Sequence, residues 1–480
     1  MKIITSLLLL VSFSVLAQDN DRFYATMSLN DAQELQKDVP NELEIVATYR
    51  NEAAVYMTKN ASHKLHDRVL VHGPGYIFKT SKEEALLALQ APKRNPDANR
   101  GAFTITEDAI VNQVLELIDK QNIETHILEL ESYGTRYHDR ATATEAAMDL
   151  KAKWEAMADS YGRTDVSVSL YNHVSTNMPS VIMTIIGAEF PDEYVVVGGH
   201  LDSTSNQGNN NAPGADDDAS GIATITEATR ALFEAGFVPK RTIEVMAYAA
   251  EEIGLVGSAE IANEYSTNNI DVLAVTQFDM TNYNGSTNDV SFITDFTNPT
   301  LNSFLMSLLD HYNNSGEHEV SYGTSLCNYG CSDHASWTSE GYMAAFPFEA
   351  NFGQHNSTIH TPNDTFSVSG TADHAAKFAK LCAEFLIEVA KSDGVLGIDE
   401  AVINELEITV GDGTLEYNLE AATQKFTKIE FYDALGKRLM EVPVSGTRGS
   451  TSVKMLSSGI YIASFRTEKG FTVAKKIVVD

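Results

Sequence analysis

The stretch Tyr194-Val-Val-Val-Gly-Gly-His-Leu-Asp-Ser203 sets the fold class of this 480-residue chain. Its first four residues form an apolar run of the kind found in strands buried on both faces of a parallel sheet. Similar runs recur at residues 181–186, 241–249 and 271–278. Amphipathic periodicity predicts helices at residues 107–120, 143–160 and 219–235. This alternation predicts an α/β domain with a largely parallel sheet over residues 102–395.

Two smaller domains flank this segment. Residues 18–101 combine strand patterns with a helix that Ser81 and Glu84 would cap, which predicts a small α+β domain. Its last part, residues 91–101, is rich in Pro, Asn and basic residues and is a natural protease target. We therefore expect a removable propeptide, with a permanently retained domain as the alternative. Residues 401–480 contain short strand-like runs between turns and predict a small β-sandwich.

The first 17 residues have the pattern of a secretory signal peptide. Lys2 precedes an almost uncharged apolar run from Ile3 to Leu16, and the small residue Ala17 ends it. The run is shorter than the roughly 20 residues of a membrane-spanning helix, which disfavours a membrane anchor. We expect cleavage near Ala17, export of the chain and no membrane span elsewhere.

Charge and cysteine content exclude further classes of protein. Lys and Arg total 34 and Asp and Glu total 66, so the formal net charge is −32. Such a surface repels nucleic acids and anionic lipids, and we expect neither as a partner. Three cysteines form at most one bridge and cannot supply a disulfide framework. We expect a globular monomer.

Acidic and imidazole side chains follow the predicted strands. His200 lies directly after the first run, two residues before Asp202; Glu251 and Glu252 follow another run, and Asp279 follows a third. Ligands bind beyond the carboxyl ends of parallel strands, so these side chains are well placed for a common site. Imidazole and carboxylate groups bind zinc, and a carboxylate that does not bind the metal can serve as a general base.

Two loop motifs complete the set. Asp216, Asp217 and Asp218 precede the helix predicted at 219–235, and His360 lies in the loop at 357–364. One Asp could merely cap the helix, but adjacent acids raise one another's pKa unless a cation lies among them. Each motif alone has an ordinary structural explanation. Together, two imidazoles, three carboxylates and a spare glutamate suit two zinc ions that share one carboxylate.

The strings GGHLDS, APGADDDASG, AYAAEE, QFDMTNY, SDHASW and IHTPNDT closely resemble the bacterial leucyl aminopeptidases of the M28 family of co-catalytic zinc peptidases. The resemblance covers roughly residues 102–395 and implies a three-layer α/β/α zinc-peptidase domain. It implies that His200, Asp217 and Asp279 bind one zinc ion. Asp217 would bridge to a second zinc ion, whose other ligands are Glu252 and His360.

Catalytic roles are implied by the same resemblance. Glu251 resembles the family's general base, which accepts the proton of a water that bridges the two metal ions. Asp202 resembles the partner of His200, and Tyr329 resembles a tyrosine near the substrate carbonyl. The implied activity is that of a secreted di-zinc aminopeptidase, which hydrolyses the first peptide bond of peptides and proteins.

The residues around Tyr329 bear on substrate choice. Cys327 and Cys331 are the cysteines expected to pair in an exported protein, with a metal site as the alternative. Several apolar positions resemble the family's pocket and imply preference for a large apolar N-terminal residue such as Leu, although ordinary core packing explains each equally well. These positions are Met280, Ile293, Phe346, Phe348, Phe352 and Ile359. Gln354-His355 replaces the Asp-Tyr that is frequent in the family, which leaves fine selectivity open.

The other histidines match no ligand motif. His334 resembles a supporting residue rather than a ligand. Nine more are interpreted as ordinary structural or surface residues: His63, His66, His72, His126, His138, His173, His311, His318 and His374.

The chain's last segment has a resemblance of its own. The runs at 456–465 and 473–479 resemble the C-terminal sorting domain of type IX secretion in Bacteroidetes. This implies contact with that secretion machinery, removal of the domain, and an extracellular or cell-surface location. A sandwich that binds a substrate or a surface is the alternative.

Two other functions are weighed against the aminopeptidase. A carboxypeptidase or dipeptidase could use a similar two-metal site. A non-catalytic binding protein of the same fold would be marked by loss of Glu251 or of a ligand, and none is lost.

Overall fold

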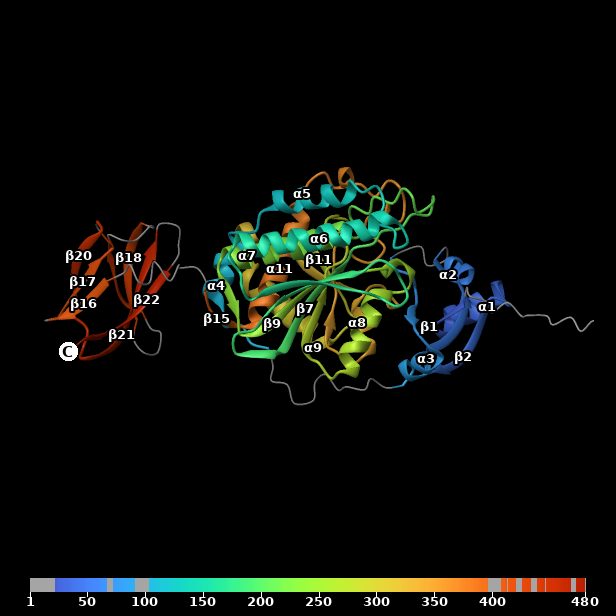
Figure 1. The fold of residues 1–480 in the computed structure, drawn as a ribbon, viewed down its shortest axis with the longest axis horizontal. Coiled ribbons are helices and arrows are strands. Elements are labelled where there is room, and N and C mark those ends of the chain that lie inside the picture. Colours follow the sequence, from blue (N-terminus) through green and yellow to red (C-terminus); the bar gives the residue numbers. More distant parts are fainter. Residues whose placement is uncertain are drawn as a thin grey trace, which may run out of the picture. The chain divides into compact units, whose positions relative to one another are not determined.

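The computed structural model describes residues 22–66, 72–90, 103–395, 407–411, 413–419, 425–432, 438–444, 446–467 and 472–479. The predicted signal peptide, residues 1–17, and the predicted linker, residues 91–101, lie outside these ranges. The chain forms two compact units, Met1–Gly394 and Val395–Asp480 (Figure 1).

An antiparallel sheet in the order β2-β3-β1-β4 forms the core of the N-terminal domain. Its strands are β1 (Arg22–Ser28), β2 (Leu43–Tyr49), β3 (Glu52–Thr58) and β4 (Ile77–Lys79). Its helices are α1 (Leu29–Asp38), α2 (Lys59–His66) and α3 (Lys82–Ala88). The Ser81 hydroxyl accepts a hydrogen bond from the Glu84 N–H at 3.1 Å, so the predicted helix cap is confirmed.

A six-stranded sheet in the order β13-β10-β7-β9-β6-β5 forms the centre of the larger domain. Its strands are β5 (Val166–Tyr171), β6 (Ser180–Ile185), β7 (Phe190–His200), β9 (Arg241–Tyr248), β10 (Asp271–Gln277) and β13 (Ala344–Ala345). The strands from β13 to β9 pair in parallel, whereas β9 with β6 and β6 with β5 pair antiparallel. The predicted mixed, largely parallel sheet is therefore confirmed.

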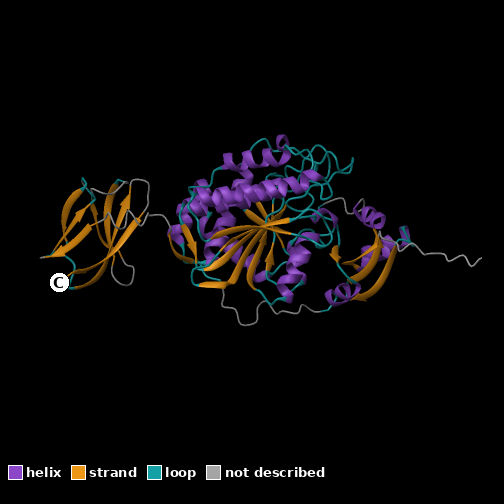
Figure 2. Cartoon of the chain, viewed as in Figure 1, coloured by secondary structure: helices purple, strands orange, loops and turns teal. Residues whose placement is uncertain are grey.

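Helices cover both faces of this sheet, and the predicted three-layer α/β/α arrangement is confirmed (Figure 2). Val195 and Val197 of β7 pack into the apolar cluster on one face, and Val196 packs into the cluster on the other. The first face carries α4 (Asp108–Leu115), α5 (Lys120–Glu131), α6 (Ala141–Ser160), α7 (Ala219–Glu234) and α11 (Asp373–Ala390). The second carries α8 (Val256–Thr267) and α10 (His334–Ser339). Helix α9 (Pro299–Tyr312) contacts α11 and the edge strand β13.

One predicted helix is wrong in its extent. Residues 107–120 form α4 and then a turn, and α5 begins at Lys120. Asp119 accepts a hydrogen bond from the Gln121 N–H at 2.9 Å and so acts as the N-cap of the second helix. The capping carboxylate starts a new helix inside a segment whose apolar periodicity continues.

Smaller elements surround the sheet. They are β8 (Phe237–Pro239) with β15 (Ser392–Val395), and β11 (Val290–Ile293) with β12 (Tyr322–Ser325) and β14 (Pro347–Phe348). Three 3₁₀ turns are η1 (Glu251–Ile253), η2 (Gly316–His318) and η3 (Phe366–Val368). No helix in the ranges described above combines the length and hydropathy needed to cross a bilayer.

The C-terminal unit contains two antiparallel sheets with a shared core. One is β16 (Glu407–Gly411), β17 (Thr414–Asn418) and β20 (Arg448–Ser452). The other is β19 (Arg438–Pro443), β18 (Phe426–Tyr432), β21 (Gly459–Thr467) and β22 (Thr472–Val479). Leu415 and Tyr417 of the first sheet pack with Ile429, Phe431 and Phe465 of the second. The predicted small β-sandwich is confirmed.

Candidate metal centre

The carboxyl ends of three adjacent parallel strands carry residues that were predicted to bind metal. His200 ends β7 and pairs with Tyr248 at the end of β9. Glu252 lies in the 3₁₀ turn that follows β9, and Asp279 follows the end of β10 by two residues. Because the strands are parallel and in register, these side chains reach the same edge of the sheet.

Asp202 orients its neighbours through both oxygens and its backbone. The Nδ1 of His200 lies 3.1 Å from the Asp202 carbonyl oxygen and 3.5 Å from Asp202 Oδ1. Asp202 also accepts the N–H of Glu251 at 2.9 Å and that of Glu252 at 3.2 Å. It therefore turns the Nε2 of His200 toward the site and positions the two glutamates.

The three consecutive aspartates have different partners. Asp218 caps α7 by accepting the Gly221 N–H at 2.8 Å, and its other oxygen accepts the His200 N–H at 2.9 Å. Asp216 accepts a hydrogen bond from the side-chain amide of Asn356 at 3.0 Å. Helix capping therefore explains Asp218, and Asp217 is left with its carboxylate directed at two imidazoles.

The donor atoms form two sets that share Asp217. In the first, His200 Nε2 lies 2.9 Å from Asp217 Oδ1 and 3.5 Å from Asp279 Oδ1. In the second, His360 Nε2 lies 3.0 Å from Asp217 Oδ2 and 3.1 Å from Glu252 Oε2. A tetrahedral zinc ion with bonds of ~2.1 Å holds its donor atoms about 3.4 Å apart. Both sets fit such an ion, and one oxygen of Asp217 faces each set.

Burial and charge also fit a cation site. Burial alone would raise the pKa of Asp217, but its hydrogen bonds with His200 and His360 hold that pKa well below its usual range. Burial, reinforced by nearby Glu252, raises the pKa of Glu251 well above its usual range. Among the described residues, neither carboxylate oxygen of Glu251 has a hydrogen-bond partner. Acids buried with so few donors are stable as anions when cations lie among them.

Glu251 is in neither donor set, although it directly precedes Glu252 in the same 3₁₀ turn. Only 1% of Glu251 is exposed. A buried carboxylate next to a metal site, but not bound to it, is suited to proton transfer.

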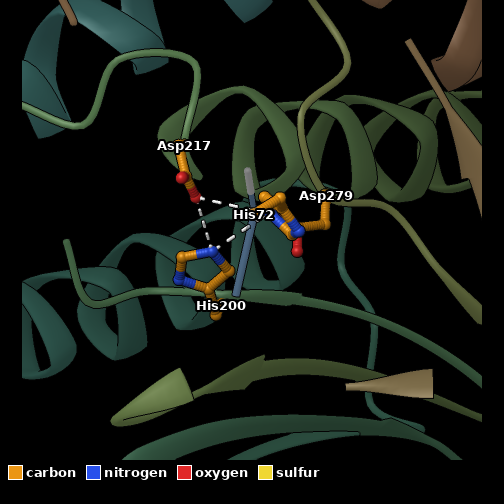
Figure 3. Close-up of side chains that lie close together, drawn as sticks. All are labelled: His72, His200, Asp217 and Asp279. Atoms are coloured by element: carbon orange, nitrogen blue, oxygen red, sulfur yellow. Dashed lines mark hydrogen bonds and ion pairs between the residues drawn. The ribbon is translucent and has the colours of Figure 1, made fainter. Parts of the chain in front are cut away.

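The interpretation of His72 as an ordinary residue is wrong. Its Nε2 lies 3.1 Å from Asp279 Oδ1 and 3.8 Å from Asp217 Oδ1, within the first donor set (Figure 3). His72 is 207 positions before Asp279 in the chain, so no local pattern places it there. His334, in contrast, stacks on Phe346 with ring centroids 4.8 Å apart, and it belongs to no donor set among the described residues.

Arg136 supports the site and was missed by the sequence interpretation. Its buried guanidinium donates hydrogen bonds to the carbonyl oxygens of Leu201, Pro213 and Gly214 at 2.8, 2.7 and 2.8 Å, and to that of Leu130 at 3.0 Å. These contacts clamp together the two ends of the segment that connects β7 to α7, and hold them against the end of α5. No motif marks Arg136, because its partners are backbone atoms that any residue could supply.

We expect Arg136→Met to lower the free energy of unfolding by about 3–5 kcal/mol, because four buried carbonyls lose a charged donor. Arg136→Lys should lower the free energy of unfolding by less, since the ammonium retains part of the hydrogen bonding. Urea unfolding of the two variants beside the wild type measures both effects. Equal stability of Arg136→Met and wild type would contradict the clamp.

The residues predicted to line a substrate pocket lie together. Met280, Ile293, Phe346, Phe348 and Ile359 form one buried apolar cluster, and Phe352 packs against it. Tyr329 and the disulfide-bonded pair Cys327–Cys331 belong to the same cluster. The His355 ring lies 5.7 Å from that of Phe348 and 5.6 Å from that of Phe352, so the Gln354-His355 departure borders this cluster.

Comparison with known proteins agrees with this geometry. Residues 180–386 match peptidase family M28. A probable leucine aminopeptidase of Arthroderma benhamiae is 35% identical over 334 residues, which cover 68% of this chain and 87% of the relative. The crystal structure of the aminopeptidase LapA of Legionella pneumophila aligns with a TM-score of 0.67 and 31% identity, over 77% of this chain and 98% of LapA. LapB of the same organism aligns with a TM-score of 0.67 and 29% identity, over 77% and 100%.

The chain belongs to peptidase family M28 and is a hydrolase. Its residues 411–480 match the secretion system C-terminal sorting domain, which indicates that the protein is secreted. The predicted likeness to a type IX sorting domain is confirmed.

Proposed function

We propose that this protein is a di-zinc aminopeptidase that removes large apolar residues, such as Leu, from the N-termini of peptides. One observation carries the proposal: Asp217 presents one oxygen to His200 and the other to His360, at the centre of two donor sets. The similarity to leucine aminopeptidases and to the aminopeptidase LapA supports cleavage at the N-terminus of the substrate.

Two zinc ions held in these sets would lower the pKa of a water between them and polarise the substrate carbonyl. Glu251 accepts the proton of the attacking water, because it is buried nearby and its oxygens have no hydrogen-bond partner in the described residues. The same carboxyl then passes the proton to the leaving amine. The Tyr329 hydroxyl donates a hydrogen bond to the substrate carbonyl.

The apolar cluster around Phe346 and Phe348 would receive the first side chain of the substrate. Its members are almost fully buried, so a large apolar side chain gains more from binding there than a polar one. His355, at the border of the cluster, is the residue we propose for fine selectivity.

We also propose that residues 18–101 are a propeptide. The segment 91–101 contains Lys93, Arg94 and Arg100, at which a trypsin-like protease can cut. Cleavage there would break the covalent link between the N-terminal domain and residues 102–395.

Hydrolysis of leucine p-nitroanilide tests the proposed activity. We expect trypsin-processed enzyme to cleave it, a zinc chelator to abolish cleavage, and added zinc to restore it. N-acetyl-leucine p-nitroanilide should be inert, because an aminopeptidase requires a free α-amine. Activity that is indifferent to the chelator would contradict the metal mechanism, and cleavage of the acetylated substrate would favour another peptidase class.

A further inference from the structure

We propose that His72, from the N-terminal domain, is a fourth ligand of the first metal position and keeps the unprocessed enzyme latent. This inference rests on the proposed function. It assigns a metal-binding role to a residue outside the M28 match at 180–386.

The donor geometry carries the first step of the argument. Donor atoms of His72, His200, Asp217 and Asp279 all lie within 4.8 Å of one another. His72 Nε2 is 3.1 Å from Asp279 Oδ1, close to the spacing of about 3.4 Å expected around a tetrahedral zinc ion. Among the residues that the structure describes, the second set contains three, Asp217, Glu252 and His360.

The number of donors decides what each position can do. A zinc position with three protein ligands keeps its fourth site for water or substrate, whereas four protein ligands close it. With His72 in place, the first position has four donors and resembles a closed, structural site. Without His72, it has three and regains the open site that hydrolysis requires.

Hydrogen bonds fix the imidazole in this orientation. His72 Nδ1 lies 2.7 Å from the carbonyl oxygen of Cys331, which leaves Nε2 directed at the acids. The ring also lies next to Phe348, with centroids 5.8 Å apart. Only 1% of His72 is exposed, so the imidazole is held inside the site and not merely above it.

The backbone of His72 forms hydrogen bonds with the hydroxyl of Tyr329, so this hydroxyl is not free to bind a substrate. The Tyr329 hydroxyl donates to the His72 carbonyl oxygen, and the His72 N–H donates to the Tyr329 oxygen at 3.2 Å. A Cβ on Gly73 would lie 3.2 Å from Glu251 Oε1, so the same segment also lies against the proposed general base. His72 and Gly73 thus contact a proposed metal ligand, the tyrosine proposed to donate a hydrogen bond to the substrate carbonyl, and the proposed general base.

The following residues anchor this segment to the peptidase domain. Tyr76 donates its hydroxyl hydrogen to the Ile253 carbonyl at 2.9 Å, and the Phe78 N–H donates to the Gly254 carbonyl at 2.8 Å. Ile77 packs with Leu255 in a small apolar cluster. These contacts hold the segment on the loop that carries the glutamates, and the segment leaves only when they are broken.

Full-length protein loaded with cobalt(II) tests the ligand directly, because the visible absorption of this ion reports its coordination geometry. We expect His72→Ala to change the spectrum and to release metal to a chelator about tenfold faster than the wild type. His63→Ala, at an exposed histidine of the same domain, should match the wild type in both measurements. His72→Phe keeps a ring beside Phe348 but has no donor nitrogen, so it should reproduce the His72→Ala spectrum even if the alanine variant folds poorly.

Peptidase assays of the same full-length chains test latency. We expect His72→Ala to cleave leucine p-nitroanilide at least about tenfold faster than the unprocessed wild type, but more slowly than the trypsin-processed enzyme, because the backbone of residue 72 still contacts Tyr329. Identical cobalt spectra for wild type and both His72 variants would overturn the proposal. So would an unprocessed His72→Ala chain as slow as the wild type, when the processed enzyme is active. If the spectra differ but every form is inactive, His72 stands as a ligand and the proposed function fails instead.

Discussion

Glu251→Gln is expected to lower kcat on leucine p-nitroanilide by about 10³-fold, with little change in zinc content. Gln has the size and shape of Glu but cannot accept a proton. The hydrogen bond from the residue 251 N–H to Asp202 is made by the backbone and persists in the variant. Because Glu251 lies outside both donor sets, the metal ligands are unchanged. Steady-state kinetics and metal analysis of the processed enzyme measure the two quantities.

Glu145→Gln is the matched control, since Glu145 is exposed on α6 and the substitution makes the same chemical change. It should retain wild-type kcat. Loss of zinc together with activity in Glu251→Gln would show that Glu251 is a ligand, and the separation of base from ligand would then be wrong.

The fold of the larger domain could be predicted because its signals are local. Strands β7, β9 and β10 each contain a short apolar run that is buried on both faces of the sheet. The order of strands in the sheet is set by packing between distant segments and could not be predicted from those runs. The break between α4 and α5 was missed because the capping signal of Asp119 competes with continuing apolar periodicity.

The candidate site could be predicted only as far as its residues follow strands or resemble a motif. His200 ends a strand and Asp279 follows one by two residues, whereas His360 was assigned by resemblance. His72 was missed because its place beside Asp279 depends on packing between segments that are 207 positions apart in the chain. Arg136 was missed because it binds backbone carbonyls, which leave no trace in the sequence.

Asp217→Asn is expected to lower zinc from about two ions per chain to less than one, whereas Asp279→Asn should remove about one. Asp217 serves both donor sets, with Oδ1 facing His200 and Oδ2 facing His360. Asp279 belongs only to the first set. An amide lacks the negative charge that a bridging ligand supplies to two cations. The affinity for zinc therefore falls at both positions together. Elemental analysis of purified chains gives the metal count.

Asp216→Asn is the neighbouring control for that series. The Asp216 carboxylate accepts hydrogen bonds from the Asn282 N–H at 3.2 Å and the Asn356 amide at 3.0 Å, and it belongs to neither donor set. Its variant should therefore keep the wild-type zinc content, even though the substitution is chemically the same and one residue away. If Asp217→Asn instead lost only one zinc ion, the two positions would bind zinc independently. This result would contradict the proposal that Asp217 bridges both ions, on which the two-metal assignment depends.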